Sequence, residues 1–118
     1  MLKLQWGLIG VLAFGGIGHL AGTLMSYPPG TEIFVWSLTA VFYVFAVVFL
    51  QALRLTRKND RWIGAGATVA TAAWMLLALG FGAAIGDILD PRGLVHAGAS
   101  AALLITTLLS ASDARSRG

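Results

Sequence analysis

Arg54-Leu55-Thr56-Arg57-Lys58-Asn59-Asp60-Arg61 is the stretch that decides the fold. This basic segment carries four of the eight lysine and arginine residues in the 118-residue chain and divides the chain into two halves. Each half consists of apolar runs that are too long and too poor in charge for the core of a small soluble domain. We therefore interpret the basic segment as a loop between membrane-spanning helices.

The composition indicates an integral membrane protein. Apolar residues make up 58% of the chain and charged residues only 11%, whereas about a quarter of the residues in soluble domains are charged. The net charge of +3 comes from basic residues at the ends of the apolar runs. Bases in these positions are typical of residues that set the orientation of a membrane protein, and they do not form the basic surface that binds nucleic acid. The absence of cysteine excludes disulfides, thiolate metal sites and cysteine nucleophiles.

Four apolar runs are long enough to span a bilayer, which takes about 20 residues. They cover about residues 4–26, 32–54, 62–86 and 91–111. Short connections make consecutive helices antiparallel neighbours. The sequence therefore predicts an all-α fold, in which residues 1–118 form a single domain of four transmembrane helices in an up-down-up-down bundle with short loops. The first run is expected to be a retained helix and not a cleaved signal peptide.

The bases also predict the orientation in the membrane. One side holds most of them: Lys3, the basic segment, Arg115 and Arg117. The other side holds one base and three of the five acidic residues: Arg92, Glu32, Asp87 and Asp90. The positive-inside rule therefore predicts that both termini are cytoplasmic, and we expect the location to be a bacterial inner membrane.

Asp87 and Arg92 are expected to form a surface ion pair, with Thr31 and Asp90 capping helices.

Small and polar residues mark the faces that should pack inward. In the third run they recur at three- and four-residue steps as Gly64, Thr68, Thr71, Met75, Ala78 and Gly82. In the fourth run the most polar face is formed by His96, Ser100, Leu103, Thr107 and Ser110. A polar face is costly in lipid, so both stripes are predicted to face the bundle interior.

The two histidines are the main candidates for a site. At about 1.5 Å per residue, His19 lies about 10 Å and His96 about 7 Å below the outer helix ends. The first and fourth helices of a closed bundle are neighbours, so the imidazoles can face each other, with Glu32 and Asp87 at the surface above them. Three interpretations remain open: hydrogen bonds between helices, a polar ligand pocket, and a bis-His haem or metal site.

No enzyme signature is present, and no catalytic residue or metal ligand is assigned. The phosphate-binding loop, GxSxG and HExxH motifs are missing, and Ser100 after His96 is not a triad. We expect a small non-enzymatic membrane protein, either an accessory subunit or a module that binds a small hydrophobic ligand from the outer leaflet. The candidate ligand-binding residues are His19, His96, Ser100, Glu32 and Asp87.

Two alternative functions remain: a bis-His haem or metal-binding redox protein, and a small oligomeric transporter or channel. The sequence indicates no particular cofactor, and the absence of a carboxylate at mid-membrane weighs against proton-coupled transport. The expected partners are the lipid bilayer, a further copy of the chain or another membrane protein, and the small ligand. Nucleic acid is not expected.

Overall fold

The computed structural model describes residues 1–57 and 59–116, and the side chains up to residue 112. Within these ranges the chain forms four α-helices and no strand, which confirms the all-α prediction. The helices are α1 (Leu2–Ser26), α2 (Glu32–Thr56), α3 (Arg61–Ala84) and α4 (Pro91–Ser116). Three charged side chains used to predict the orientation lie outside the described part: Lys58, Arg115 and Arg117.

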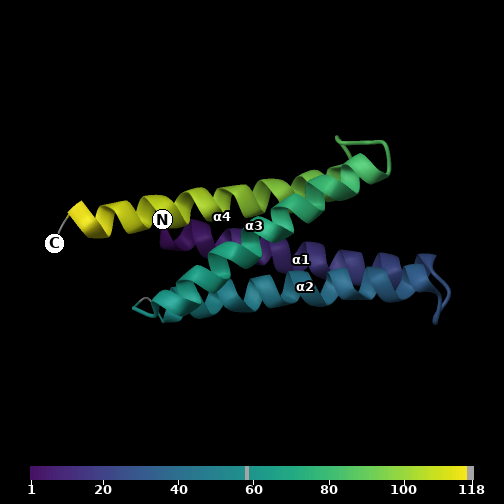
Figure 1. Cartoon of the computed structure of the whole chain (residues 1–118), viewed down its shortest axis with the longest axis horizontal. Helices are drawn as coiled ribbons and strands as arrows, with labels where there is room; N and C mark the ends of the chain where they lie inside the picture. Colours follow the sequence, from purple (N-terminus) through teal and green to yellow (C-terminus); the bar gives the residue numbers. More distant parts are fainter. Residues whose placement is uncertain (58, 117–118) are drawn as a thin grey trace.

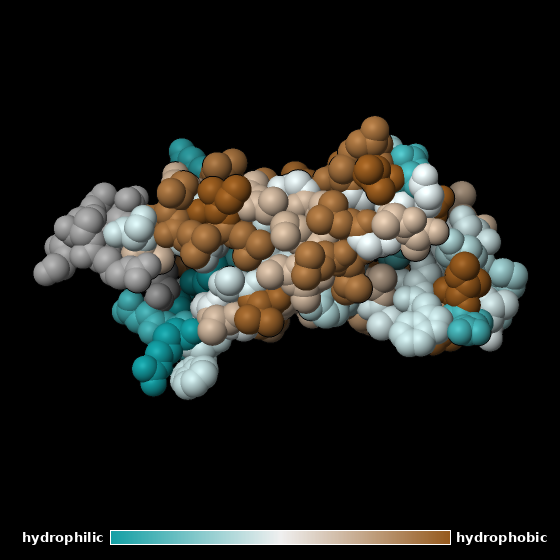
Figure 2. Space-filling model, turned by 45° about the horizontal axis from the view of Figure 1, so that its top comes forward, coloured by the Kyte–Doolittle hydropathy of each residue, from teal (hydrophilic) through white to brown (hydrophobic). Residues whose placement is uncertain are grey.

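All four helices are long and apolar enough to cross a membrane. The 24 residues of α3, the shortest helix, span about 36 Å at 1.5 Å per residue, against a hydrocarbon thickness of about 30 Å. Large apolar side chains point outward, including Phe14, Phe42 and Leu108 at 79%, 73% and 64% exposure. Figure 2 shows hydrophobic surface along the bundle and hydrophilic residues gathered toward its ends. The chain is therefore an integral membrane protein.

The helices form a closed ring in chain order. Each helix packs on the next, and α4 returns to pack on α1. In Figure 1 the helices alternate in direction, so that α1 begins and α4 ends at the end of the bundle that carries the α2–α3 loop. This arrangement is consistent with the predicted up-down-up-down bundle, and it makes α1 and α4 neighbours, as the histidine hypothesis requires.

Local capping explains where the helices begin and end. Thr31 Oγ1 accepts a hydrogen bond from the Phe34 N–H at 3.4 Å, so Thr31 caps α2 as predicted. Asp60 caps α3 in the same way, through the N–H groups of the next turn. The third helix ends at Ala84, two residues before the predicted limit, because Gly86 adopts the left-handed conformation with φ of 75°.

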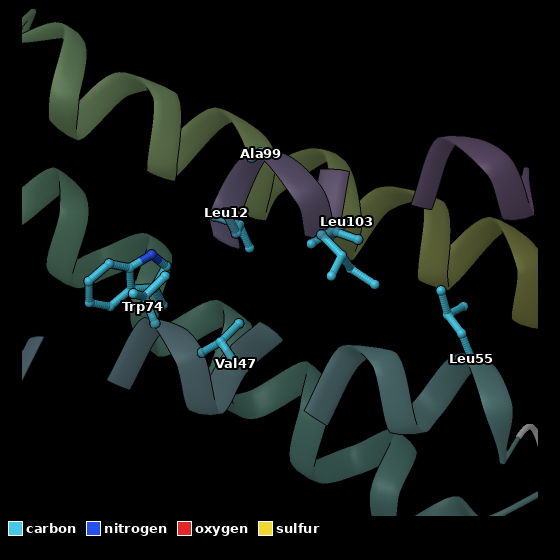
Figure 3. Close-up of a cluster of buried hydrophobic side chains, with 8 residues drawn as sticks. Leu12, Val47, Leu55, Trp74, Ala99 and Leu103 are labelled. Atoms are coloured by element: carbon cyan, nitrogen blue, oxygen red, sulfur yellow. The ribbon is translucent and has the colours of Figure 1, made fainter. Parts of the chain in front are cut away.

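Apolar side chains from all four helices fill the centre of the bundle (Figure 3). Leu12, Val47 and Leu103 are fully buried there, and Trp74 of α3 is 7% exposed. The predicted inward face of α3 is correct at Thr71, Ala78 and Gly82 and wrong elsewhere: Ala67 and Trp74 are buried, whereas Gly64, Thr68 and Met75 are only half-buried. The reason is that Trp74 finds both a ring partner and a hydrogen-bond partner inside the bundle.

Asp90 anchors the first turn of α4. Its Oδ1 accepts hydrogen bonds from the backbone N–H and the Nε of Arg92, both at 2.9 Å, and its Oδ2 accepts from Arg92 Nη2 at 2.8 Å. Asp90 is thus a cap, as predicted. The ion pair with Arg92, which was expected at Asp87, is formed by Asp90. The side-chain hydrogen bond from Arg92 is the main reason why the pKa of Asp90 falls to about 2.

The ion pair predicts an acid-sensitive contribution to stability. Since the pKa of Asp90 in the folded protein lies below the ordinary value of 3.8, its contribution is present above that value and is lost as the pH falls toward about 2. Asp90→Asn keeps a capping oxygen but cannot form the ion pair. In thermal unfolding, the wild type should be the more stable protein at pH 7, and the difference should shrink between about pH 4 and pH 2. Parallel pH profiles would contradict this account.

Candidate functional site

His96 of α4 contacts helices on both of its sides. Trp74 Nε1 donates a hydrogen bond to His96 Nδ1 at 3.3 Å, and the two rings meet edge to face with centroids 5.4 Å apart. The opposite edge of the imidazole lies over Gly15 of α1, where an added Cβ would be 2.7 Å from both Cε1 and Nε2 of His96. His96 therefore joins α4 to α3 and to α1, and Gly15 supplies the space that its ring occupies.

A row of aromatic side chains continues this junction to the remaining helix. Tyr43 of α2 stacks on Trp74 with ring centroids 5.7 Å apart, and its hydroxyl donates to the Ala70 carbonyl at 3.3 Å. Tyr43, Trp74 and His96 thus connect α2, α3 and α4, and the row ends on Gly15 of α1. The sequence analysis missed Trp74 and Tyr43. The available signal was a tryptophan in mid-span, whose indole N–H needs a partner when it is buried.

His19 of α1 belongs to a separate hydrogen-bond network with α2. Thr23 Oγ1 donates to the His19 carbonyl at 2.8 Å and lies 2.6 Å from Ser37 Oγ, which lies 3.4 Å from His19 Nε2. The single hydroxyl proton of Thr23 is used on the carbonyl, so Ser37 donates to Thr23. His19 Nε2 must then carry a proton and donate it to Ser37.

The same reasoning assigns the proton on His96. The indole N–H of Trp74 can only donate, so His96 Nδ1 is unprotonated and the ring carries its proton on Nε2. The Nδ1 atom of His19, by contrast, has no hydrogen bond within the described part of the chain. His19 is half-buried, and it forms no ion pair with a described carboxylate that would favour a charged ring in hydrocarbon. His19 therefore offers an unused lone pair.

The two histidines lie on adjacent helices at a similar level. Gly15, which the His96 ring covers, lies one helical turn from His19. The His19 ring lies against Ser37 of α2, whereas the His96 ring lies between Trp74 of α3 and Gly15 of α1. Arg92 at the start of α4 also acts electrostatically on His19, and its exposed guanidinium lies 5.3 Å from the centre of the Phe81 ring. The sequence analysis did not include Arg92 in the site.

The other predicted site residues lie apart from this pair. Ser100 is fully buried one turn below His96, and its Oγ has no hydrogen-bond partner. Glu32 is exposed and lines an open hollow of about 480 Å³ with Thr31, Ile33 and Trp36. Asp87 is exposed, and its Oδ1 accepts from the Leu89 N–H at 3.0 Å. The structure thus brings His19 and His96 together without joining them to these residues in one pocket.

The donor set does not fit a haem or a metal ion held by both histidines. A coordinating imidazole needs an unprotonated nitrogen, and in His96 that nitrogen already accepts from Trp74. The contact between His96 and Gly15 also leaves no gap for a macrocycle between α1 and α4. In the described residues, no group of three or more histidine, aspartate or glutamate side chains could hold a metal ion.

Comparison with known proteins gives no match: no family model, no curated protein and no solved structure matches the chain. Antiparallel four-helix bundles serve many unrelated functions, so the architecture does not indicate one. The side chains around His19 and His96 therefore carry the functional inference.

Proposed function

We propose that the protein is a small non-enzymatic integral membrane protein that binds an amphipathic ligand from the outer leaflet, beside His19. The supporting observation is the unused Nδ1 lone pair of a half-buried imidazole whose Nε2 is held by Ser37. A polar atom without a partner is costly in hydrocarbon. A ligand hydroxyl or amine that donates to Nδ1 would remove this cost.

The surroundings of His19 favour a ligand with an apolar body. Gly18 and Gly22 leave open space on α1, since nothing lies within 4 Å of an added Cβ at either position. Val95 on the neighbouring α4 is 49% exposed and offers apolar surface. Arg92 supplies positive charge at the outer end. The ligand class is therefore an amphiphile whose head carries a hydrogen-bond donor, with an acidic group tolerated near Arg92.

The interior of the bundle supports binding over transport. Leu12, Val44 and Leu103 are fully buried at its centre, where a water-filled path would have to pass. Two open hollows in the described residues lie at the ends of helices and not along the axis.

Binding can be tested with two probes that differ only in their hydroxyl protons. The purified protein in maltoside micelles is titrated with a monoacylglycerol and with its dimethyl ether of the same chain length, in which neither oxygen can donate. We expect the hydroxyl compound to bind about 2- to 10-fold more tightly, the range of one neutral hydrogen bond. His19→Phe keeps a ring but removes both nitrogens, so it should abolish the preference. Thr39→Ala, which changes an exposed hydroxyl elsewhere on α2, should preserve it. Equal binding of both probes to the wild type would refute the proposal.

We propose that both termini and the basic segment lie on the cytoplasmic side of a bacterial inner membrane. The chain has no cysteine, so single cysteines report their own exposure to a membrane-impermeant maleimide. In intact cells, Ile88→Cys in the α3–α4 loop should be labelled, and Asn59→Cys in the α2–α3 loop should react only after the cells are opened. The reverse pattern would contradict this orientation.

Association with a second copy or another membrane protein is a second proposal for the same face. Gly18 and Gly22 are spaced as in close helix pairs, and both are open. A Gly22→Leu substitution should then lower the mass of the detergent-solubilised particle measured by light scattering. An unchanged mass would leave the ligand as the occupant of this face.

A further inference from the structure

A buried polar cluster lies near the inner end of the bundle, far from His19. The side chain of Gln51 is fully buried, and its Nε2 donates to Thr71 Oγ1 at 2.6 Å and to the Ala67 carbonyl at 3.4 Å. Its Oε1 accepts a hydrogen bond from Arg54 Nε at 2.8 Å. Gln51 is thus satisfied at both ends and holds Arg54 in position.

Arg54 is left with an unmet requirement. Its Nη2 is inaccessible and has no hydrogen-bond partner. The one ion pair found in the described residues joins Arg92 to Asp90 at the other end of the bundle. Arg54 therefore has no counter-charge among the described residues. Arg54 as a whole is half-buried, but an inaccessible guanidinium N–H group without an acceptor is unfavourable.

Gln5 of α1 presents a second unused donor at the same level. It is 3% exposed, and its Nε2 is buried without a partner. The contacts of Thr23 with Ser37 and of Gly16 with Val44 set the register of the antiparallel α1–α2 pair. Continued toward the inner end, this register places Gln5 opposite Leu55, the residue that follows Arg54 in the chain.

We propose that Arg54 and Gln5 bind a phosphate group at the inner end of the bundle, a site distinct from the proposed outer-leaflet site. Both unused groups are donors, and one is cationic, so the missing partner must be an anionic acceptor. Phosphate oxygens accept from guanidinium and amide groups together.

The phosphate can belong to an inner-leaflet lipid or to a soluble compound. Full-length protein in phosphate-free maltoside micelles is titrated with phosphatidylglycerol, with diacylglycerol as the lipid without phosphate, and with inorganic phosphate, while the unfolding midpoint is followed. We expect a saturable stabilisation by phosphatidylglycerol or by inorganic phosphate, and none by diacylglycerol. The responding arm identifies the source of the phosphate.

The variants separate this site from general attraction by the bases. Arg54→Gln should raise the apparent Kd about 10-fold or more, as expected for the loss of a charged hydrogen bond, and Gln5→Leu about 2- to 10-fold. Arg57→Gln removes the same charge from an exposed position and should change the apparent Kd less than about 3-fold. If Arg54→Gln does not fold, the apparent Kd values of Arg54→Lys and Gln5→Leu test the site in its place.

Three results would overturn the proposal. A wild type without saturable dependence on either phosphate probe would show that water alone satisfies the two donors. Equal losses in Arg54→Gln and Arg57→Gln would indicate diffuse attraction. An unchanged apparent Kd in Gln5→Leu would remove Gln5 from the site.

Discussion

Trp74→Ala is expected to lower the free energy of unfolding by about 3–5 kcal/mol, the usual cost of deleting a buried aromatic side chain. Trp74 is 7% exposed, stacks on Tyr43 and donates to His96. Its removal leaves a cavity where α2, α3 and α4 meet, and it leaves His96 Nδ1 without a donor. Reversible unfolding in mixed micelles, followed by circular dichroism, measures the loss.

Two further substitutions identify the cause of that loss. Trp74→Phe keeps a six-membered ring but removes the N–H and part of the ring volume, so it should cost about 1–3 kcal/mol, less than Trp74→Ala. Trp36→Ala removes a tryptophan that is 66% exposed and should change stability by no more than about 0.5 kcal/mol. If Trp74→Ala costs no more than Trp36→Ala, the aromatic row does not hold the helices together.

Gly15→Val is expected to destabilise the protein by about 1–3 kcal/mol through overpacking. The added Cβ would lie 2.7 Å from two atoms of the His96 ring. Because Trp74 fixes that ring, it can move only by losing its hydrogen bond, or α1 and α4 must separate. Thermal unfolding of the variant, beside Gly18→Val as the matched control with open space, measures the effect.

A double-mutant cycle tests whether His96 is the cause. In a His96→Ala background the valine at position 15 meets no ring, so the cost of Gly15→Val should largely disappear. A cost that persists in that background would show that α1 loses stability for a reason unrelated to the contact with α4.

The fold followed from the sequence because lipid imposes strong constraints on a chain. Uncharged runs of spanning length can satisfy their backbone groups only as helices, so the four spans were predictable from hydropathy. Thr31 and Asp90 act as the predicted caps, because capping depends on local geometry. The predicted third span ended two residues too late, at residue 86. The sequence analysis did not assign Gly86 the left-handed conformation that ends α3.

The candidate site was less predictable, because helical periodicity gives the face of a residue but not its rotamer. The similar depths predicted for His19 and His96 placed them at a similar level in adjacent helices. The partners of the rings, Ser37 and Trp74, depend on how far each helix is rotated about its axis. A small rotation puts Trp74 inside in place of Met75, and an apolar pattern does not distinguish these two possibilities.

The most direct test of the proposed function is nitrogen-15 NMR of the histidine side chains in lipid nanodiscs. The chain has only two histidines, so His19→Phe assigns both spectra. Both rings should be neutral with the proton on Nε2, and a monoacylglycerol should shift the Nδ1 signal of His19 and leave that of His96 unchanged. A proton on Nδ1 of His19, or an Nδ1 signal that does not respond to the amphiphile, would contradict the proposed site.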